Sequence, residues 1–194
     1  MSQEHQSVDL VGDETVKQFT GAVLIAALTA VLAQFNIPIP SISPDFSLQP
    51  FGMFFAGLVL GPLWGGFALA LYLLAGIAGA PVFSNGSAGL GYLLVGEGTG
   101  GFLIGFLVGA VVSGAIVHRG IEPRDLSEVS VPVQVAGLFA AVVVVYLIGV
   151  PWLANIFDIS LARAAATMAP YVPLDIVKLA IAVGIVQGGY LARQ

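Results

Sequence analysis

Residues 51–79 have the sequence FGMFFAGLVLGPLWGGFALALYLLAGIAG, which is 29 consecutive residues without a charged side chain. A single α-helix of that length would extend about 43 Å, which exceeds the hydrocarbon core of a bilayer, about 30 Å thick. Gly61 and Pro62 interrupt the run, and proline breaks a helix whereas glycine permits a turn. We therefore predict two membrane-spanning helices here, the first of them short.

The composition of the whole chain points to the same environment. Hydrophobic residues make up 58% of the 194 residues and charged residues only 9%, whereas a soluble domain typically carries about 25% charged residues. A surface so poor in charge requires lipid as its outer solvent. The chain has no cysteine, which excludes disulfides and thiolate metal sites. Its net charge of −5 gives no support for nucleic-acid binding.

Further apolar runs lie on either side of this segment. They cover residues 19–35, 100–117, 131–150 and 173–191. Loops rich in polar residues, glycine or proline are expected at 36–50, 80–99, 118–130 and 151–172. We therefore predict an all-α integral membrane protein with six transmembrane helices in one domain, residues 17–194, preceded by a polar cytoplasmic tail at residues 1–16.

The charged residues predict the orientation of this bundle in the cell membrane. Six spans place both termini on the same side. If that side is the cytoplasm, the inner face carries Lys17, Arg119, Arg124 and Arg193, and the outer loops carry only Arg163. This distribution agrees with the positive-inside rule. The three long loops then lie on the outer face, where a ligand from outside the cell arrives.

Asp175 and Lys178 are the strongest polar signal in the chain. They are three residues apart, so they share one face of the last helix. With Pro173 in the first turn, Lys178 lies about 7 Å into the span. An ionisable residue inside a span costs at least about 2.5 kcal/mol and indicates a functional site by default. The alternatives are a structural ion pair or a lysine that extends outward to the interface.

Other polar and aromatic residues lie near the same outer level. They are Gln49, Asn85, Ser87, Tyr92, Glu97, Thr99 and Tyr171. Asn85 precedes Gly86, so it either forms a turn or contacts a ligand. Glu97 lies between two glycines and is favoured as a solvated loop residue. Tyr92 fits an interface anchor as well as the wall of a pocket.

Familiar catalytic motifs are absent from the sequence. A Walker A loop requires lysine after glycine, whereas Lys17 and Lys178 each follow valine. His5 and His118 lie in the tail and in an inner loop, so an HExxH zinc site is excluded. Ser87 lacks the first glycine of a G-x-S-x-G motif. We therefore expect a protein that is not an enzyme, with no ATPase site, metal or cofactor of its own.

Small residues recur at a spacing of four in several of the predicted helices. The three sets are Ala22, Ala26 and Ala30; Gly101, Gly105, Gly109 and Ser113; and Ala180, Gly184 and Gly188. Each set forms a smooth stripe that permits close helix contact. The stripes are interpreted first as packing inside the bundle and second as docking surfaces for another membrane protein.

Several motifs, in order along the chain, resemble the BioY family, the biotin-specific substrate-binding (S) components of energy-coupling factor (ECF) transporters. Residues 26–30 (AALTA) lead into 37–40 (IPIP), and residues 47–49 (SLQ) precede Gly57 and Gly61-Pro62. The remaining segments are 76–83 (GIAGAPVF), 99–106 (TGGFLIGF) and 170–178 (PYVPLDIVK). The sequence departs from the family pattern at Ser47 (usually Thr), at Glu97-Gly98 (Gly-Pro) and at Leu174 (Gly).

The resemblance implies a six-helix S-component bundle that holds biotin near the outer face, beneath the loop between the third and fourth helices. Ureido N–H groups of biotin suit Asp175, and Lys178 suits either the ureido carbonyl or the carboxylate. Asn85 and Gln49 suit either end of the ligand, and Phe83, Tyr92 and Tyr171 suit the apolar thiophane ring. The implied partners are a transmembrane coupling subunit and two ATPases, with the first-helix stripe Ala22, Ala26 and Ala30 as the coupling contact.

Two other classes of function remain as alternatives. The first is a self-sufficient secondary transporter or channel that uses Asp175 and Lys178 as a proton relay. The second is a membrane-embedded enzyme, which is disfavoured because the sequence offers no catalytic constellation.

Overall fold

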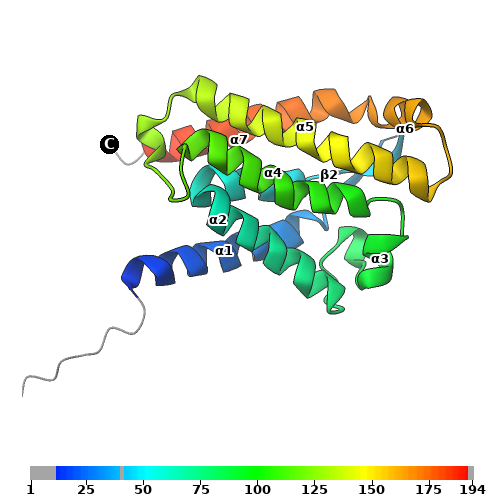
Figure 1. Cartoon of the computed structure of the whole chain (residues 1–194), viewed down its shortest axis with the longest axis horizontal. Helices are drawn as coiled ribbons and strands as arrows, with labels where there is room; N and C mark the ends of the chain where they lie inside the picture. The colour runs from blue at the N-terminus through cyan, green and yellow to red at the C-terminus, as the bar shows by residue number, and fades with distance from the viewer. Residues whose placement is uncertain (1–11, 40–41, 192–194) are drawn as a thin grey trace, which may run out of the picture.

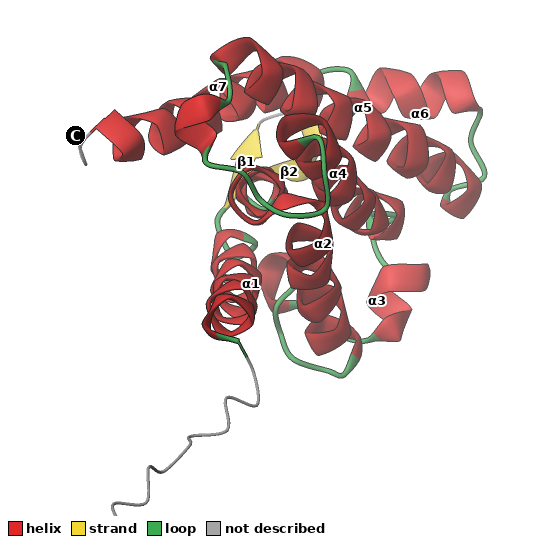
Figure 2. Ribbon diagram, turned by 60° about the vertical axis from the view of Figure 1, so that its left-hand side comes forward, coloured by secondary structure: helices red, strands yellow, loops and turns green. Residues whose placement is uncertain are grey.

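The computed structural model describes residues 12–39 and 42–191, which fold mainly into α-helices (Figure 1). Within these ranges, the helices long and apolar enough to cross a membrane are α1 (Asp13–Leu32), α2 (Pro50–Ile77), α4 (Gly100–His118), α5 (Val131–Ile156) and α7 (Tyr171–Leu191). The connecting segments contain β1 (Asn36–Ile39), β2 (Ile42–Ser47), η1 (Ser84–Gly86), α3 (Leu90–Leu94), η2 (Leu126–Glu128) and α6 (Leu161–Met168). The two strands pair antiparallel, with Asn36 opposite Ser47 (yellow in Figure 2).

Helix α2 folds back on itself at Gly61, whose φ of 71° and ψ of −173° are not helical. In a straight helix, Gln49 and Tyr72 would lie about 35 Å apart. Instead, the Gln49 side-chain amide donates a hydrogen bond of 2.6 Å to the Tyr72 hydroxyl. A methyl group at Gly65 would lie 2.6 Å from the carbonyl oxygen of Ala56, so the two arms touch close to the turn. The division predicted at Gly61-Pro62 is therefore confirmed, and the five candidate spans among the described residues contain six helical segments.

His118, at the end of α4, stabilises this turn. Pro62 has no N–H, so the carbonyl of Leu58 loses its usual helical donor. The buried His118 ring places Nε2 at 2.9 Å from that carbonyl and at 3.2 Å from the carbonyl of Gly57. Its Nδ1 accepts the backbone N–H of Arg124 at 2.9 Å, which assigns the ring proton to Nε2. One imidazole thus joins α2, α4 and the loop that follows α4.

The small-residue stripes differ in what they face. In α1, Ala22 has no exposed surface, and Ala26 and Ala30 are partly buried against the core. In α4, methyl groups at Gly105 and Gly109 would meet Val145 and Ala141 of α5, so that stripe packs inside the bundle. The α7 stripe is exposed, and methyl groups at Gly184 and Gly188 would meet nothing within 4 Å.

The ends of the bundle hold different elements. In Figure 1 the start of α1, the α4–α5 connection and the end of α7 lie at one end, and α3 and α6 lie at the other. The start of α1 and the end of α7 therefore lie at the same end of the bundle. Arg193, one of the charges used to predict the orientation, lies outside the described residues, as do residues 1–11 of the predicted tail.

Several predicted boundaries were wrong. Residues 151–172 are not a loop: α5 continues through Pro151 to Ile156, and α6 follows because Ala164 and Met168 bury against Val150 and Leu153. The loop at 36–50 contains the strand hairpin. The tail ends before residue 16, because α1 begins at Asp13 with two acidic residues in its first turn, where they suit the helix dipole.

Candidate functional site

A cavity of about 910 Å³ lies at the end of the bundle that carries the hairpin, α3 and α6. This volume is within the range of about 300–1,000 Å³ typical of small-molecule sites. Six of the seven ligand residues predicted from the sequence line it, together with further polar and apolar groups. They are Gln49, Asn85, Tyr92, Tyr171, Asp175 and Lys178.

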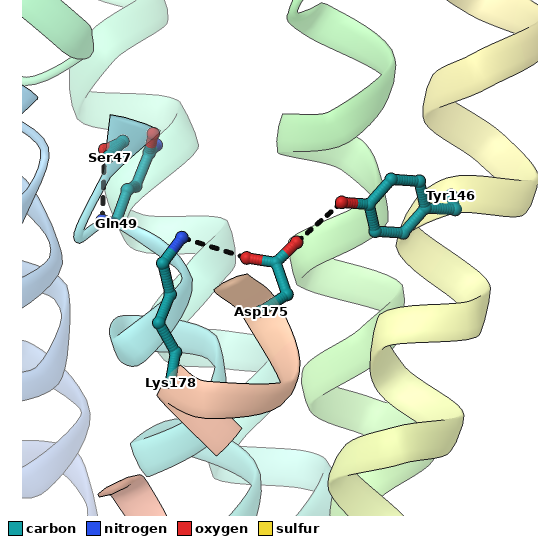
Figure 3. A network of polar contacts seen from close by, with 5 residues as sticks. All are labelled: Ser47, Gln49, Tyr146, Asp175 and Lys178. Atoms are coloured by element: carbon teal, nitrogen blue, oxygen red, sulfur yellow. Dashed lines mark hydrogen bonds and ion pairs between the residues drawn. The ribbon is translucent and has the colours of Figure 1, made fainter. Parts of the chain in front are cut away.

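Asp175 and Lys178 form a buried ion pair in the wall of this cavity (Figure 3). Lys178 Nζ lies 2.9 Å from Asp175 Oδ1, and the two side chains are only 5% and 14% exposed. The hydroxyl of Tyr146, on α5, donates a hydrogen bond of 2.7 Å to the other carboxylate oxygen. Both oxygens of Asp175 thus have a partner in the protein, and each keeps lone-pair capacity for a ligand donor.

The strand hairpin covers the other side of Lys178. Its ammonium group lies 4.0 Å from the centre of the Phe46 ring, in β2. A cation over an aromatic face is attracted by the ring quadrupole, so Phe46 and Asp175 together compensate the charge of a side chain that is almost completely buried. The alternative in which Lys178 extends outward is not what the structure shows, because the residue is only 4% exposed.

Gln49 is held in a second polar network, at the start of α2. Its side-chain amide donates to the Tyr72 hydroxyl, which donates in turn to the Val82 carbonyl at 3.1 Å. The Ser47 hydroxyl accepts the Gln49 backbone N–H at 3.1 Å (Figure 3). The side-chain oxygen of Gln49 accepts a long bond of 3.5 Å from Ser84. That oxygen is the weakly engaged group and therefore the one suited to a ligand donor.

The loop that contains Asn85 is tied to the chain leaving α1. Gln34 donates to the Phe83 carbonyl at 3.1 Å and accepts the Gly86 N–H at 2.9 Å. The Asn36 side chain donates to Asn85 Oδ1 at 3.1 Å. Asn85 has a φ of 57°, a left-handed conformation that asparagine tolerates. It therefore forms the predicted turn and also lines the cavity.

The aromatic candidates differ in depth. Tyr92 lines the cavity, and burial raises the pKa of its hydroxyl, so this group remains a protonated donor at neutral pH. Phe83 has no exposed surface and is not among the cavity residues. Its ring stacks behind Tyr92 at 5.3 Å and contacts Tyr72 at 5.6 Å. Phe83 therefore supports the ring of Tyr92 from behind. The Phe83 ring also packs directly on Gly76, where a methyl group would collide with it.

Sequence reasoning missed several residues of the wall. Tyr146 lies inside the apolar run at 131–150, and only its polar hydroxyl group could have indicated a role in the site. Asn36 in β1 and Arg163 in α6 belong to segments that were predicted as loops and that carry no local motif. Of the other polar residues noted near this level, Glu97 and Thr99 line the cavity and Ser87 does not.

Comparisons with known proteins agree with this architecture. The family model described as the BioY family matches residues 2–193. A probable biotin transporter BioY from Pyrococcus horikoshii is 34% identical over 171 residues, covering 88% of this chain and 94% of that protein. The biotin transporter BioY from Thermotoga maritima is 34% identical over 168 residues, covering 86% and 92%.

A solved structure shares the fold. The crystal structure of the S-component for biotin from an ECF-type ABC transporter matches with a TM-score of 0.82 and covers 95% of both chains. Its sequence identity to this chain is 24%, so the match supports the fold.

Proposed function

The chain belongs to the BioY family, and we propose that it takes up biotin as the substrate-binding component of an ECF-type transporter. One observation carries the assignment: the Asp175–Lys178 ion pair is buried in the wall of a cavity of suitable size. Removing two charges from water is costly. A ligand that forms hydrogen bonds with both charged groups in the cavity wall offsets part of this desolvation cost, which favours ligands with matching polar groups.

The chemistry of biotin matches the two polar networks. Its ureido ring has two N–H donors and one carbonyl acceptor. Asp175 offers carboxylate oxygens to the donors, and Lys178 offers an ammonium group to the carbonyl. The Gln49 oxygen and the Asn85 amide lie on the other elements around the cavity and offer further partners. Apolar residues such as Phe102, Phe106 and Leu153 suit the thiophane ring and the methylene chain.

Energy for uptake comes from separate proteins in this proposal. The sequence has no Walker A lysine. Two separate ATPase subunits therefore hydrolyse ATP, and a transmembrane coupling subunit links them to this chain. Ala26 and Ala30 remain the proposed coupling contact, because each keeps part of its surface exposed. Ala22 does not, since it is fully buried. In the proposed orientation both termini are cytoplasmic and the cavity faces outward.

The decisive experiment follows labelled biotin in vesicles that contain the chain alone, or with the coupling subunit and the two ATPases. The proposal expects the isolated chain to bind biotin without concentrating it, and accumulation to require ATP. An ATPase pair whose Walker A lysines are replaced by alanine is the matched control. Accumulation by the chain alone under a proton gradient would contradict the proposal and favour a secondary transporter.

The coupling contact is tested with Ala26→Trp in the same system. We expect biotin binding by the isolated chain to persist and ATP-dependent accumulation to fail. Loss of both would show that the stripe serves only internal packing, as it does at Ala22.

A further inference from the structure

Some of the charged residues around the cavity have an ion-pair partner and others do not. Among the described residues that line it, four are charged, two of each sign: Glu97, Arg163, Asp175 and Lys178. Asp175 and Lys178 neutralise each other at 2.9 Å. Among the residues that the structure describes, Arg163 forms no ion pair within 4.0 Å. Of the two cations among the described residues that line the cavity, Arg163 is therefore the one without an ion-pair partner.

Arg163 and the buried pair lie at different levels of the bundle. Asp175 is joined to Tyr146 of α5. Arg163 belongs to α6, whose Ala164 and Met168 are buried in one cluster with Val150 and Leu153 of α5, four and seven residues after Tyr146. Those distances in sequence correspond to about 6–10 Å along the axis of α5. Arg163 is also an exposed residue, so its side chain is accessible from the mouth of the cavity.

Resting on the proposed function, we infer that Arg163 binds the carboxylate of biotin at the mouth of the cavity, while the ureido ring contacts Asp175 and Lys178. The extended methylene chain of biotin separates these two polar ends, as the structure separates the two sets of residues. Guanidinium binds carboxylate through paired, charge-assisted hydrogen bonds. Placing the carboxylate on Lys178 instead would put a second anion beside Asp175, only one cation being available there.

This assignment makes Arg163 a determinant of specificity. Glu97, the other charged residue of the wall outside the buried pair, repels a carboxylate. Arg163 then provides the preference for ligands with a free acid over ligands whose acid is converted to an amide. A neutral ligand, biotinamide, keeps the ureido ring and the methylene chain and loses only the negative charge.

The test compares biotin and biotinamide on the purified full chain, by calorimetric titration of the wild type, Arg163→Gln and Arg124→Gln. We expect Arg163→Gln to weaken biotin binding about tenfold, the usual size of one hydrogen bond to a charged group. Binding of biotinamide should change by less than about twofold, which also shows that the variant is folded. Arg124→Gln removes the same charge from the loop at the opposite end of the bundle and should change neither.

Two results would overturn the inference. Equal weakening of both ligands by Arg163→Gln would give Arg163 a structural role, and unchanged binding of both would give it none. Failure of the wild type to bind either ligand is a different outcome, because it contradicts the proposed function itself.

Discussion

Tyr146 donates a hydrogen bond of 2.7 Å to Asp175, although the two residues are 29 positions apart and belong to different helices. The contact fixes the carboxylate of α7 against α5, while the other oxygen of Asp175 remains on Lys178. A buried carboxylate held from two sides is preorganised, and preorganisation reduces the entropy lost when a ligand binds.

Tyr146→Phe should therefore weaken biotin binding without unfolding the bundle. The ring remains to pack edge-on against Phe102 at 6.1 Å, and only the hydroxyl is lost. A hydrogen bond to a charged group contributes about 1.5 kcal/mol or more, so we expect about a tenfold increase in Kd. Calorimetric titration measures it. An unchanged Kd would show that Asp175 is positioned by Lys178 alone.

Lys178→Met should have a larger effect, because it leaves Asp175 as an uncompensated buried charge. We expect a loss of at least about 2 kcal/mol in biotin binding, with membrane insertion retained. The chain contains a matched control: Lys17 pairs with Glu14 at the same i,i+3 spacing, but the two side chains are 77% and 71% exposed. Lys17→Met should change binding by less than about 0.5 kcal/mol. Equal effects of the two variants would contradict the site.

Much of the fold was predictable because the deciding signals are local. Membrane helices follow from apolar length, and the break in α2 follows from Gly61-Pro62. Other elements depend on distant contacts. Helix α6 forms where Ala164 and Met168, four residues apart on one face, meet the end of α5. The sequence of residues 151–172 does not show which helix that face packs against.

The candidate site was likewise predictable where its residues are close in sequence, and not where they come from different helices. Asp175 and Lys178 share a helix face by spacing alone, and their pairing is confirmed. Tyr146 was not predictable, because its role depends on how α5 packs against α7. Phe83 was expected to touch the ligand, but the loop turns its ring inward behind Tyr92. Which residues of a loop face a cavity is decided by tertiary packing rather than by sequence pattern.

His118 provides a test of the turn within α2. His118→Leu removes the donor to the Leu58 carbonyl and leaves a buried acceptor unsatisfied, which costs about 1–3 kcal/mol. We expect a lower midpoint of thermal unfolding and an unchanged Kd for biotin, because the cavity lies at the other end of the bundle. Arg124→Ala is the control, since Arg124 contacts His118 through its backbone N–H. Equal midpoints for His118→Leu and wild type would contradict the proposed role.

The orientation is testable by cysteine labelling, because the natural chain has no cysteine. Asn85→Cys should react with a membrane-impermeant maleimide on intact cells, since the cavity is proposed to face outward. Arg124→Cys should react only after the membrane is permeabilised, because it lies in the α4–α5 connection at the opposite end (Figure 1). Labelling of both positions from the same side would contradict the topology.

The central claim is that this chain alone binds biotin through the cavity that contains Asp175. The most direct measurement is calorimetric titration of biotin into the purified full chain, wild type and Asp175→Ala, with no other transporter subunit present. We predict saturable binding at a single site in the wild type and a loss of at least about 2 kcal/mol in Asp175→Ala. Absence of binding by the wild type, or equal binding by both proteins, would contradict the account.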